Sequence, residues 1–270
     1  MHFYKMAVLG QDYIFLNEKG SVEKLKKEDI KRLCDRHNGI GADGIFGIVE
    51  KCSKNVRIRA FGFDGELLPD CSSAAICASF GLKMSHGVDC MEICCEKSNF
   101  FALNCDIGKG ISSVSCDIKN SFFEGKNDIT ERKTELGNRI LTLTGVFTSG
   151  IYAIHFSSCP ENLDRKYLSE KTESHALFDK QAKLVICSEA DENHIEMQSV
   201  LMHGIEIAPF AGAYCATAIA MVRTGRCKSG AEIKISYGEE TAFVYAENRN
   251  HAVITCDVKM IYKGEILLDC

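Results

Sequence analysis

The most constraining feature of the sequence is a cysteine motif that occurs twice, about half a chain apart. The first copy, Cys71–Gly81, reads CSSAAICASFG, and the second, Cys215–Gly225, reads CATAIAMVRTG. In both copies two small residues follow the cysteine, an Ala-rich run comes next, and a glycine stands ten residues after the cysteine. An internal repeat of this kind predicts two similar halves, each organised around one helix of small residues.

The residues before the first motif predict where its helix begins. Asp64-Gly65 is a turn signal, so we expect Cys71 where a loop becomes a helix over Ser72–His86. By analogy the second helix is expected over Ala216–Gly225. Backbone N–H groups at a helix start carry partial positive charge, and they favour a thiolate and bind anions. Two inert buried thiols are the alternative interpretation, because buried cysteines are common.

Alternating apolar residues predict strands around both helices. The expected strands lie in Met1–Leu16, Ile45–Glu50, Asn55–Phe63, 88–118, Leu141–Phe156, Lys183–Cys187, His194–Ile207 and 231–268. Two further helices are expected over Lys26–His37 and Leu163–Phe178, and Gly87 is expected to end the first cysteine helix. The predicted fold class is therefore α+β.

Composition narrows the classes of function. A chain of 270 residues has room for two domains, and its formal charge of −5 with interspersed signs argues against a nucleic-acid partner. No apolar run approaches a membrane span, and Met1–Met6 does not look like a signal peptide. Fifteen scattered cysteines then indicate reduced thiols in a cytoplasmic protein. The absence of CxxC and His-x-His spacings gives no support to a metal site.

Several segments together carry a family resemblance. The opening Met1–Asp12, the run LCDRHNGIGADG at Leu33–Gly44, Asp64-Gly65 ahead of Cys71, and the ending Lys263–Glu265 all contribute. In this order and spacing they resemble the diaminopimelate epimerases, which are cofactor-independent amino acid racemases with two cysteines. The resemblance covers most of the chain.

The resemblance implies a fold and a mechanism. The fold would have two pseudo-symmetric halves, each a strongly curved, mainly antiparallel sheet around a central helix. The first half would be residues 1–117, joined by a C-terminal strand at 259–270, and the second half residues 118–258. Cys71 would be one catalytic residue and Cys215 the other, working without a cofactor. One thiolate would remove the α-proton of an amino acid, and the other thiol would return a proton to the opposite face.

The resemblance also suggests residues that contact the substrate. Glu206 matches a family glutamate that helps to hold the substrate ammonium group, and Gln11 stands where the family has asparagine. Ser72–Ser73 replace the first residues of a family Gly-Asn-Gly, and Ala216–Thr217 replace those of Gly-Thr-Gly or Gly-Ser-Gly. We expect their N–H groups, and the Ser and Thr hydroxyls, to remain available as donors.

The residues that read the far end of diaminopimelate differ most from the family. Gly62, Thr148 and Lys183 correspond to three asparagines, and Ile207 to an arginine. Gly62 is expected to open volume beside Ile207. A site that binds its substrate through hydrogen bonds discriminates strongly against molecules that cannot form them. These changes therefore predict a substrate other than diaminopimelate.

The sequence therefore predicts a racemase or epimerase of a free amino acid, whose partner is that small molecule, with a homodimer left open. One alternative is diaminopimelate epimerase itself. The other is a non-catalytic small-molecule-binding protein on the same scaffold.

Overall fold

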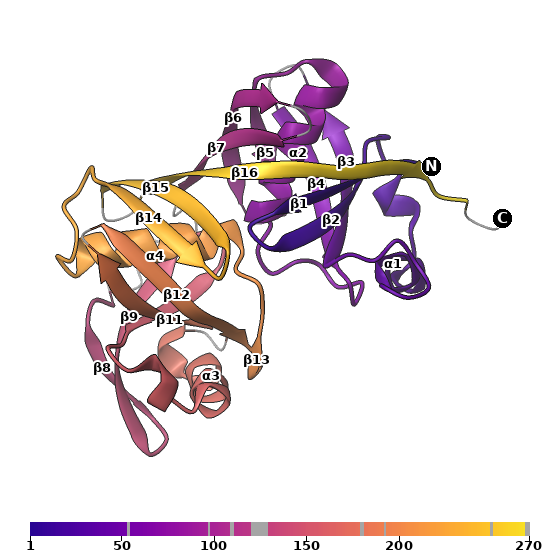
Figure 1. Cartoon of the computed structure of the whole chain (residues 1–270). Coiled ribbons are helices and arrows are strands. Elements are labelled where there is room, and N and C mark those ends of the chain that lie inside the picture. Colours follow the sequence, from indigo (N-terminus) through magenta and orange to yellow (C-terminus); the bar gives the residue numbers. More distant parts are fainter. Residues whose placement is uncertain are drawn as a thin grey trace. The chain divides into compact units, whose positions relative to one another are not determined.

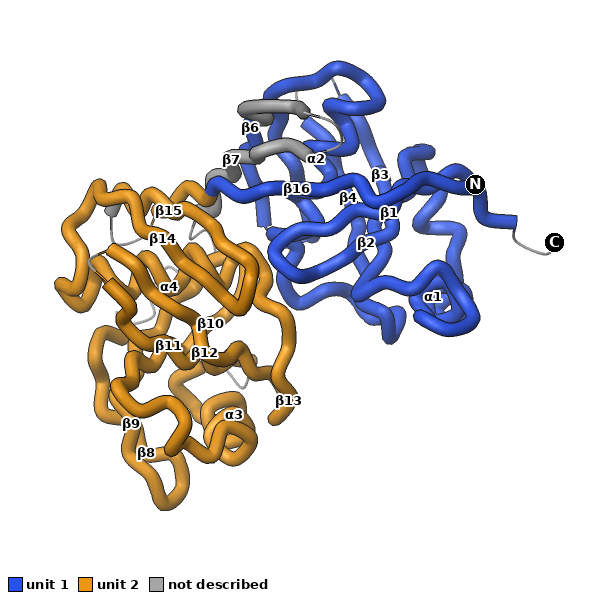
Figure 2. Tube along the Cα trace, in the orientation of Figure 1, with its two compact units in different colours: residues 1–117, 255–270 blue, residues 118–254 orange. Residues whose placement is uncertain are grey.

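The chain forms two compact units (Figure 2). The computed structural model describes residues 1–52, 55–96, 98–108, 111–119, 129–178, 181–191, 193–248 and 251–267. Unit 1 comprises Met1–Asp117 and Thr255–Cys270, and unit 2 comprises Ile118–Ile254. Residues 255–258, which the sequence assigned to the second half, thus lie in unit 1.

The sheet of unit 1 alternates antiparallel and parallel pairs along the chain (Figure 1). Strand β1 pairs antiparallel with β2, β2 parallel with β3, β3 antiparallel with β4, β4 parallel with β5, and β5 antiparallel with β6. The last strand, β16, pairs antiparallel with β1. The elements are β1 (His2–Val8), β2 (Gln11–Leu16), η1 (Val22–Lys24), α1 (Lys27–Cys34), β3 (Gly44–Lys51), β4 (Asn55–Gly62), α2 (Ser72–His86), β5 (Cys90–Cys94) and β6 (Asn99–Gly108). Two more strands, β7 (Ile111–Lys119) and β16 (His251–Glu265), lie mostly in unit 1 and have residues 118–119 and 251–254 in unit 2.

Unit 2 repeats this pattern. Strand β9 pairs antiparallel with β10, β10 parallel with β11, β11 antiparallel with β12, β12 parallel with β14, and β14 antiparallel with β15. Two further strands, β8 and β13, pair antiparallel with β9 and β12. The elements are β8 (Arg132–Leu136), β9 (Arg139–Phe147), β10 (Ile151–Phe156), η2 (Pro160–Asn162), α3 (Arg165–Ser174), η3 (Ala176–Phe178), β11 (Lys183–Asp191), β12 (His194–Met202), β13 (Ile205–Glu206), α4 (Ala211–Arg223), β14 (Glu232–Tyr237) and β15 (Glu240–Asn248).

The helices occupy equivalent connections in the two units. Parallel neighbours need a crossover connection, and α1 and α3 supply the first crossover, while α2 and α4 supply the second. The expected α+β fold with two pseudo-symmetric halves is therefore confirmed. Each half carries its cysteine in the same connection.

The two cysteine helices are buried over most of their length and lie at the centre of each unit. Helix α2 contacts β1, β2, β4, β5 and β6, and α4 contacts β9, β10, β14 and β15. A helix without a polar face is stable only when surrounded. Small residues bring the strands close: a Cβ at Gly81 of α2 would lie 2.6 Å from Cε1 of Phe15.

Helix α2 has the predicted bounds, with Cys71 as its N-cap and Gly87 as a left-handed C-cap (φ 67°). The predicted start of the second helix is wrong, since α4 begins at Ala211, and Cys215 is its fifth residue. A proline closely precedes each helix, Pro69 before α2 and Pro209 before α4. Proline ends an extended segment, and Pro209 marked the start of α4 better than Cys215 did.

Candidate active site

In unit 1, Cys71 stands at the start of α2 beside a buried carboxylate. Its side chain is partly exposed, and its Sγ lies 4.0 Å from the carbonyl oxygen of Leu68. Asp70 is 1% exposed, and its Oδ1 accepts the N–H of Ser72 at 2.8 Å and the hydroxyl of Ser72 at 2.6 Å. The donors of Ser72 therefore face an internal carboxylate, contrary to the expectation that they remain available. Ser73 is fully buried.

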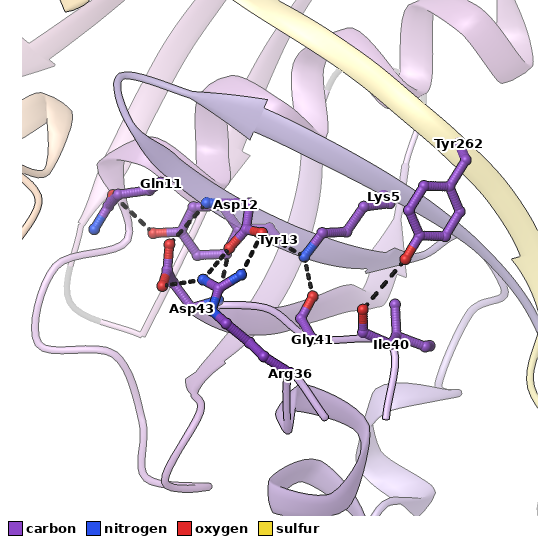
Figure 3. Close-up of polar contacts among 9 residues, drawn as sticks. All are labelled: Lys5, Gln11, Asp12, Tyr13, Arg36, Ile40, Gly41, Asp43 and Tyr262. Carbon is purple, nitrogen blue, oxygen red and sulfur yellow. Dashed lines mark hydrogen bonds and ion pairs between the residues drawn. The ribbon is translucent and has the colours of Figure 1, made fainter. Parts of the chain in front are cut away.

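Gln11 and Tyr13 lie on β2, a strand that helix α2 contacts. Both side chains are buried on β2, and Tyr13 Oη donates to Gln11 Oε1 at 2.9 Å (Figure 3). Burial raises the pKa of Tyr13 well above its usual value.

A charged network holds the backbone next to Gln11 (Figure 3). The carboxylate of Asp12 accepts from Lys5 Nζ at 2.7 Å and from two nitrogens of Arg36 at 2.8 and 3.0 Å. Asp43 also accepts from Arg36, at 2.7 Å, and from the backbone N–H of Asp12, at 2.9 Å. Although burial opposes ionisation, the hydrogen bonds from Arg36 and Lys5 lower the pKa of Asp12. Burial, reinforced by the charge of Asp12, raises the pKa of Asp43.

In unit 2, two of the predicted residues converge on the first turn of α4. Thr148 Oγ1 donates to the carbonyl oxygen of Gly212 at 3.3 Å. The ammonium group of Lys183 lies 4.9 Å from the ring centroid of Tyr152 and 5.4 Å from that of Phe210, the N-cap of α4. Lys183 is 2% exposed, so aromatic faces contact a desolvated cation here. Cys215 follows on the same helix and is fully buried.

Glu206 and Ile207 lie at the edge of unit 2. Glu206 is exposed on β13, accepts from Tyr237 Oη at 3.2 Å, and has a nitrogen of Arg165 at 3.8 Å. Ile207 is half-buried, and its backbone N–H donates to the carbonyl oxygen of Val200. Glu206 therefore already shares its carboxylate with a phenol and a guanidinium group.

The residues that follow Cys215 point into the core of unit 2. Ala216 and Thr217 are fully buried. The Thr217 hydroxyl lies 3.7 Å from Sδ of Met197 and 4.0 Å from Sγ of Cys187. These contacts give no support to Thr217 as a donor to a ligand.

Gly62 does not open the volume expected of it. A Cβ added at Gly62 would lie 3.0 Å from Oδ1 of Asp64 and 3.6 Å from Cδ2 of Leu68. The turn that follows β4 therefore fills the space beside this glycine.

The sequence interpretation missed Asp70, Tyr13 and Tyr152, one of the two aromatic neighbours of Lys183. Asp70 carries a recognisable signal, because aspartate just before a helix accepts its first N–H groups. Tyr13 carries one too, since residues two apart on a strand share a face. Tyr152 and Lys183 are neighbours on the paired strands β10 and β11, and no local sequence pattern predicts this contact.

The described residues also bear on a metal site and on a membrane-spanning helix. No group of three or more His, Cys, Asp or Glu among them could hold a metal ion. None of the described helices is long and apolar enough to cross a membrane.

Comparison with known proteins gives full-length relatives. A diaminopimelate epimerase of Acetivibrio thermocellus is 24% identical over 282 residues, covering 100% of this chain and 99% of that protein. The structure of a predicted epimerase from Pseudomonas aeruginosa matches with a TM-score of 0.71 and 12% identity, covering 99% of both chains. A hydroxyproline epimerase from Agrobacterium vitis matches with a TM-score of 0.62 and 11% identity, covering 98% of this chain and 91% of the other. No family model matches the chain.

Fold and relatives together define the class of protein. The structural matches show a shared fold, and the full-length sequence relatives are epimerases, so the chain is an isomerase. Over almost its whole length it is similar to diaminopimelate epimerases, at 22–24% identity.

Proposed function

We propose that this protein is a cofactor-independent amino acid racemase or epimerase that uses Cys71 and Cys215 as its acid–base pair. The observation that carries the proposal is the repeated topology. Each unit places one cysteine near the start of the central helix, in the connection between its fourth and fifth repeated strands. A pair of thiols of this kind suits inversion at one carbon, because each can serve one face.

The proposed reaction is a transfer of protons at the α-carbon. One thiolate takes the α-proton, so that an S–H bond forms and the C–H electron pair stays on the substrate. The other cysteine, as a thiol, gives its proton to the opposite face of that carbon. The two cysteines exchange these roles with the handedness of the substrate. A site that excludes water strengthens every contact that stabilises the developing negative charge.

We further propose that the substrate is an amino acid other than diaminopimelate. An apolar Ile207 replaces an arginine of the related family, and Thr148 and Lys183 replace two asparagines. In this proposal the ammonium group of Lys183 contacts an acidic or hydrogen-bonding group at the end of the substrate side chain. Diaminopimelate would bring a distal carboxylate and a distal ammonium, and the latter would meet a like charge. An unpaired buried charge costs about 3 kcal/mol or more, which corresponds to at least about a hundredfold lower turnover of diaminopimelate.

The test is a competition in heavy water. The protein is incubated with LL-diaminopimelate and a panel of L-amino acids, and α-deuterium uptake is read by mass spectrometry. We expect uptake into one or a few common amino acids, and at least about a hundredfold less into diaminopimelate. Preferential uptake into diaminopimelate would instead identify the chain as a diaminopimelate epimerase.

The alternative of another class, a non-catalytic binding protein, makes a different prediction. Such a protein would bind an amino acid, as measured by calorimetry, and would leave its α-proton unexchanged. Binding without exchange across the whole panel would overturn the proposed function.

A further inference from the structure

The segment that leads to Cys71 is held on strand β4. The backbone N–H of Leu68 donates to the carbonyl oxygen of Ala60 at 3.0 Å, and Leu67 forms an isolated antiparallel bridge with Phe61. The chain is therefore anchored on the sheet of unit 1 only a few residues before helix α2 begins.

The residues that follow form a turn, which a side chain closes around Cys71. Asp70 Oδ1 accepts the N–H of Ser72, two residues further on, at 2.8 Å, and the hydroxyl of Ser72 at 2.6 Å. Aspartate side chains commonly close turns in this way. The enclosed Cys71 has φ −97° and ψ 6°, a sparsely populated region of backbone conformation in which many active-site residues lie. The turn thus sets the backbone conformation of the cysteine.

Asp70 also takes over the role of the helix cap. The N-cap of an α-helix is usually Ser, Thr, Asp or Asn, whose side chain accepts one of the first helical N–H groups. Here the N-cap is Cys71, whose side chain makes no such bond, and the acceptor for the first helical N–H comes from the residue before it. The capping position can therefore carry a thiol without leaving that N–H group unpaired.

Burial distinguishes the three side chains of this turn. Asp70 is 1% exposed and Ser72 is 0% exposed, whereas the side chain of Cys71 is partly exposed. Its Sγ lies 4.0 Å from the carbonyl oxygen of Leu68. A buried carboxylate is stable only when it is hydrogen-bonded, so the contacts of Asp70 with Ser72 are costly to break. Of the three side chains, the thiol is the one that reaches the surface.

We propose that Asp70 is a positioning residue, whose carboxylate closes the turn and thereby holds the Cys71 thiol in the orientation needed for proton transfer. The place of the acceptor oxygen has this role, and the negative charge does not, because both contacts come from neutral donors. The inference rests on the proposed function and deepens it. It concerns Cys71 only, since Cys215 is the fifth residue of α4 and not its N-cap.

Three replacements of Asp70 separate geometry from charge. Asp70→Asn keeps an acceptor oxygen in place without the charge, Asp70→Glu keeps the charge but moves it by one methylene group, and Asp70→Ala removes both. With the amino acid found in the exchange screen, we expect Asp70→Asn to keep kcat within about threefold of wild type. Asp70→Glu and Asp70→Ala should lower kcat roughly 10- to 100-fold, because a displaced catalytic group slows a reaction steeply. KM should change by less than about threefold, since the contacts that bind the substrate remain.

Alkylation of Cys71 reports the placement of the thiol without any substrate. The rate with iodoacetamide is read by peptide mass mapping, relative to exposed Cys52 in the same sample. We expect a rate at least about threefold higher in Asp70→Glu and Asp70→Ala, because the thiol is released from the turn, and a rate near that of wild type in Asp70→Asn. Asp35→Ala is the matched control, because the Asp35 carboxylate also accepts backbone N–H groups two and three residues further on. It should change neither the kinetics nor the alkylation of Cys71.

The outcomes distinguish this inference from the proposed function. Circular dichroism checks that each variant is folded, and either Asp70→Glu or Asp70→Ala suffices beside Asp70→Asn. Wild-type kcat and alkylation in the folded Glu or Ala variant, a loss confined to KM, or an Asp70→Asn that behaves like Asp70→Ala would overturn the inference alone. A wild-type protein that exchanges no α-proton would overturn the proposed function and with it the role of Asp70 in proton transfer. The alkylation rates would then still show whether Asp70 holds the thiol.

Discussion

Asp12 shows how one carboxylate can organise a region of the fold. It pairs with the buried ammonium group of Lys5 and with Arg36. Its backbone N–H donates to the carboxylate of Asp43, and the backbone N–H of Asp43 donates to the carboxylate of Asp12. Removing its charge would leave the buried ammonium group of Lys5 without this partner, and removing one partner of a buried ion pair strongly destabilises the fold. We expect Asp12→Asn to lower the free energy of unfolding by about 2–4 kcal/mol at pH 7, measured by urea denaturation.

The effect should depend on pH with a definite sign. The folded-state pKa of Asp12 lies below its ordinary value, so ionisation stabilises the fold above about pH 4. This stabilisation is lost as the pH falls through that value toward the lowered pKa. The difference between wild type and Asp12→Asn should therefore be largest at pH 5–7 and shrink near pH 2–3. Asp257→Asn, an exposed control, should differ little from wild type at either pH. A difference that grows on acidification would contradict this account.

Helix α2 owes its start to Asp70. The carboxylate accepts both the first helical N–H and the hydroxyl of Ser72. We expect Asp70→Ala to lower the free energy of unfolding by about 1–3 kcal/mol, because two buried donors lose their acceptor. Asp70→Asn keeps an acceptor oxygen and should cost less than half as much. Equal urea midpoints for wild type and Asp70→Ala would show that this cap contributes nothing.

The two cysteine helices show what the sequence could predict about elements. Helix α2 was predictable to the residue, because a turn, a proline and a C-terminal glycine bracket it. Helix α4 was not, because its start was inferred from the cysteine, and the Ala211–Tyr214 segment ahead of it is also helical. Local capping signals fixed one boundary, and analogy between the copies misplaced the other.

At the scale of the whole molecule, the cysteine motif that occurs twice in the sequence corresponds to two units with the same order of antiparallel and parallel strand pairs. The division into two similar halves followed from the duplicated motif, since two copies imply two similar cores. The α+β class followed from the pattern of strands and helices. Much of the detail at the candidate site did not follow. The aromatic contacts of Lys183, the sulfur contacts of Thr217 and the filled space beside Gly62 come from other strands, turns and helices. Such tertiary contacts leave no local pattern.

The central claim, that Cys71 and Cys215 both carry protons, is tested most directly by replacing each thiol. Cys71→Ala and Cys215→Ala are assayed for racemisation of both enantiomers of the amino acid found in heavy water, with exposed Cys52→Ala as the control. Circular dichroism checks that each variant is folded. We predict that either active-site replacement reduces turnover by about a thousandfold or more, while the control keeps normal turnover. Near-normal turnover of both enantiomers by either Cys71→Ala or Cys215→Ala would contradict the two-thiol mechanism.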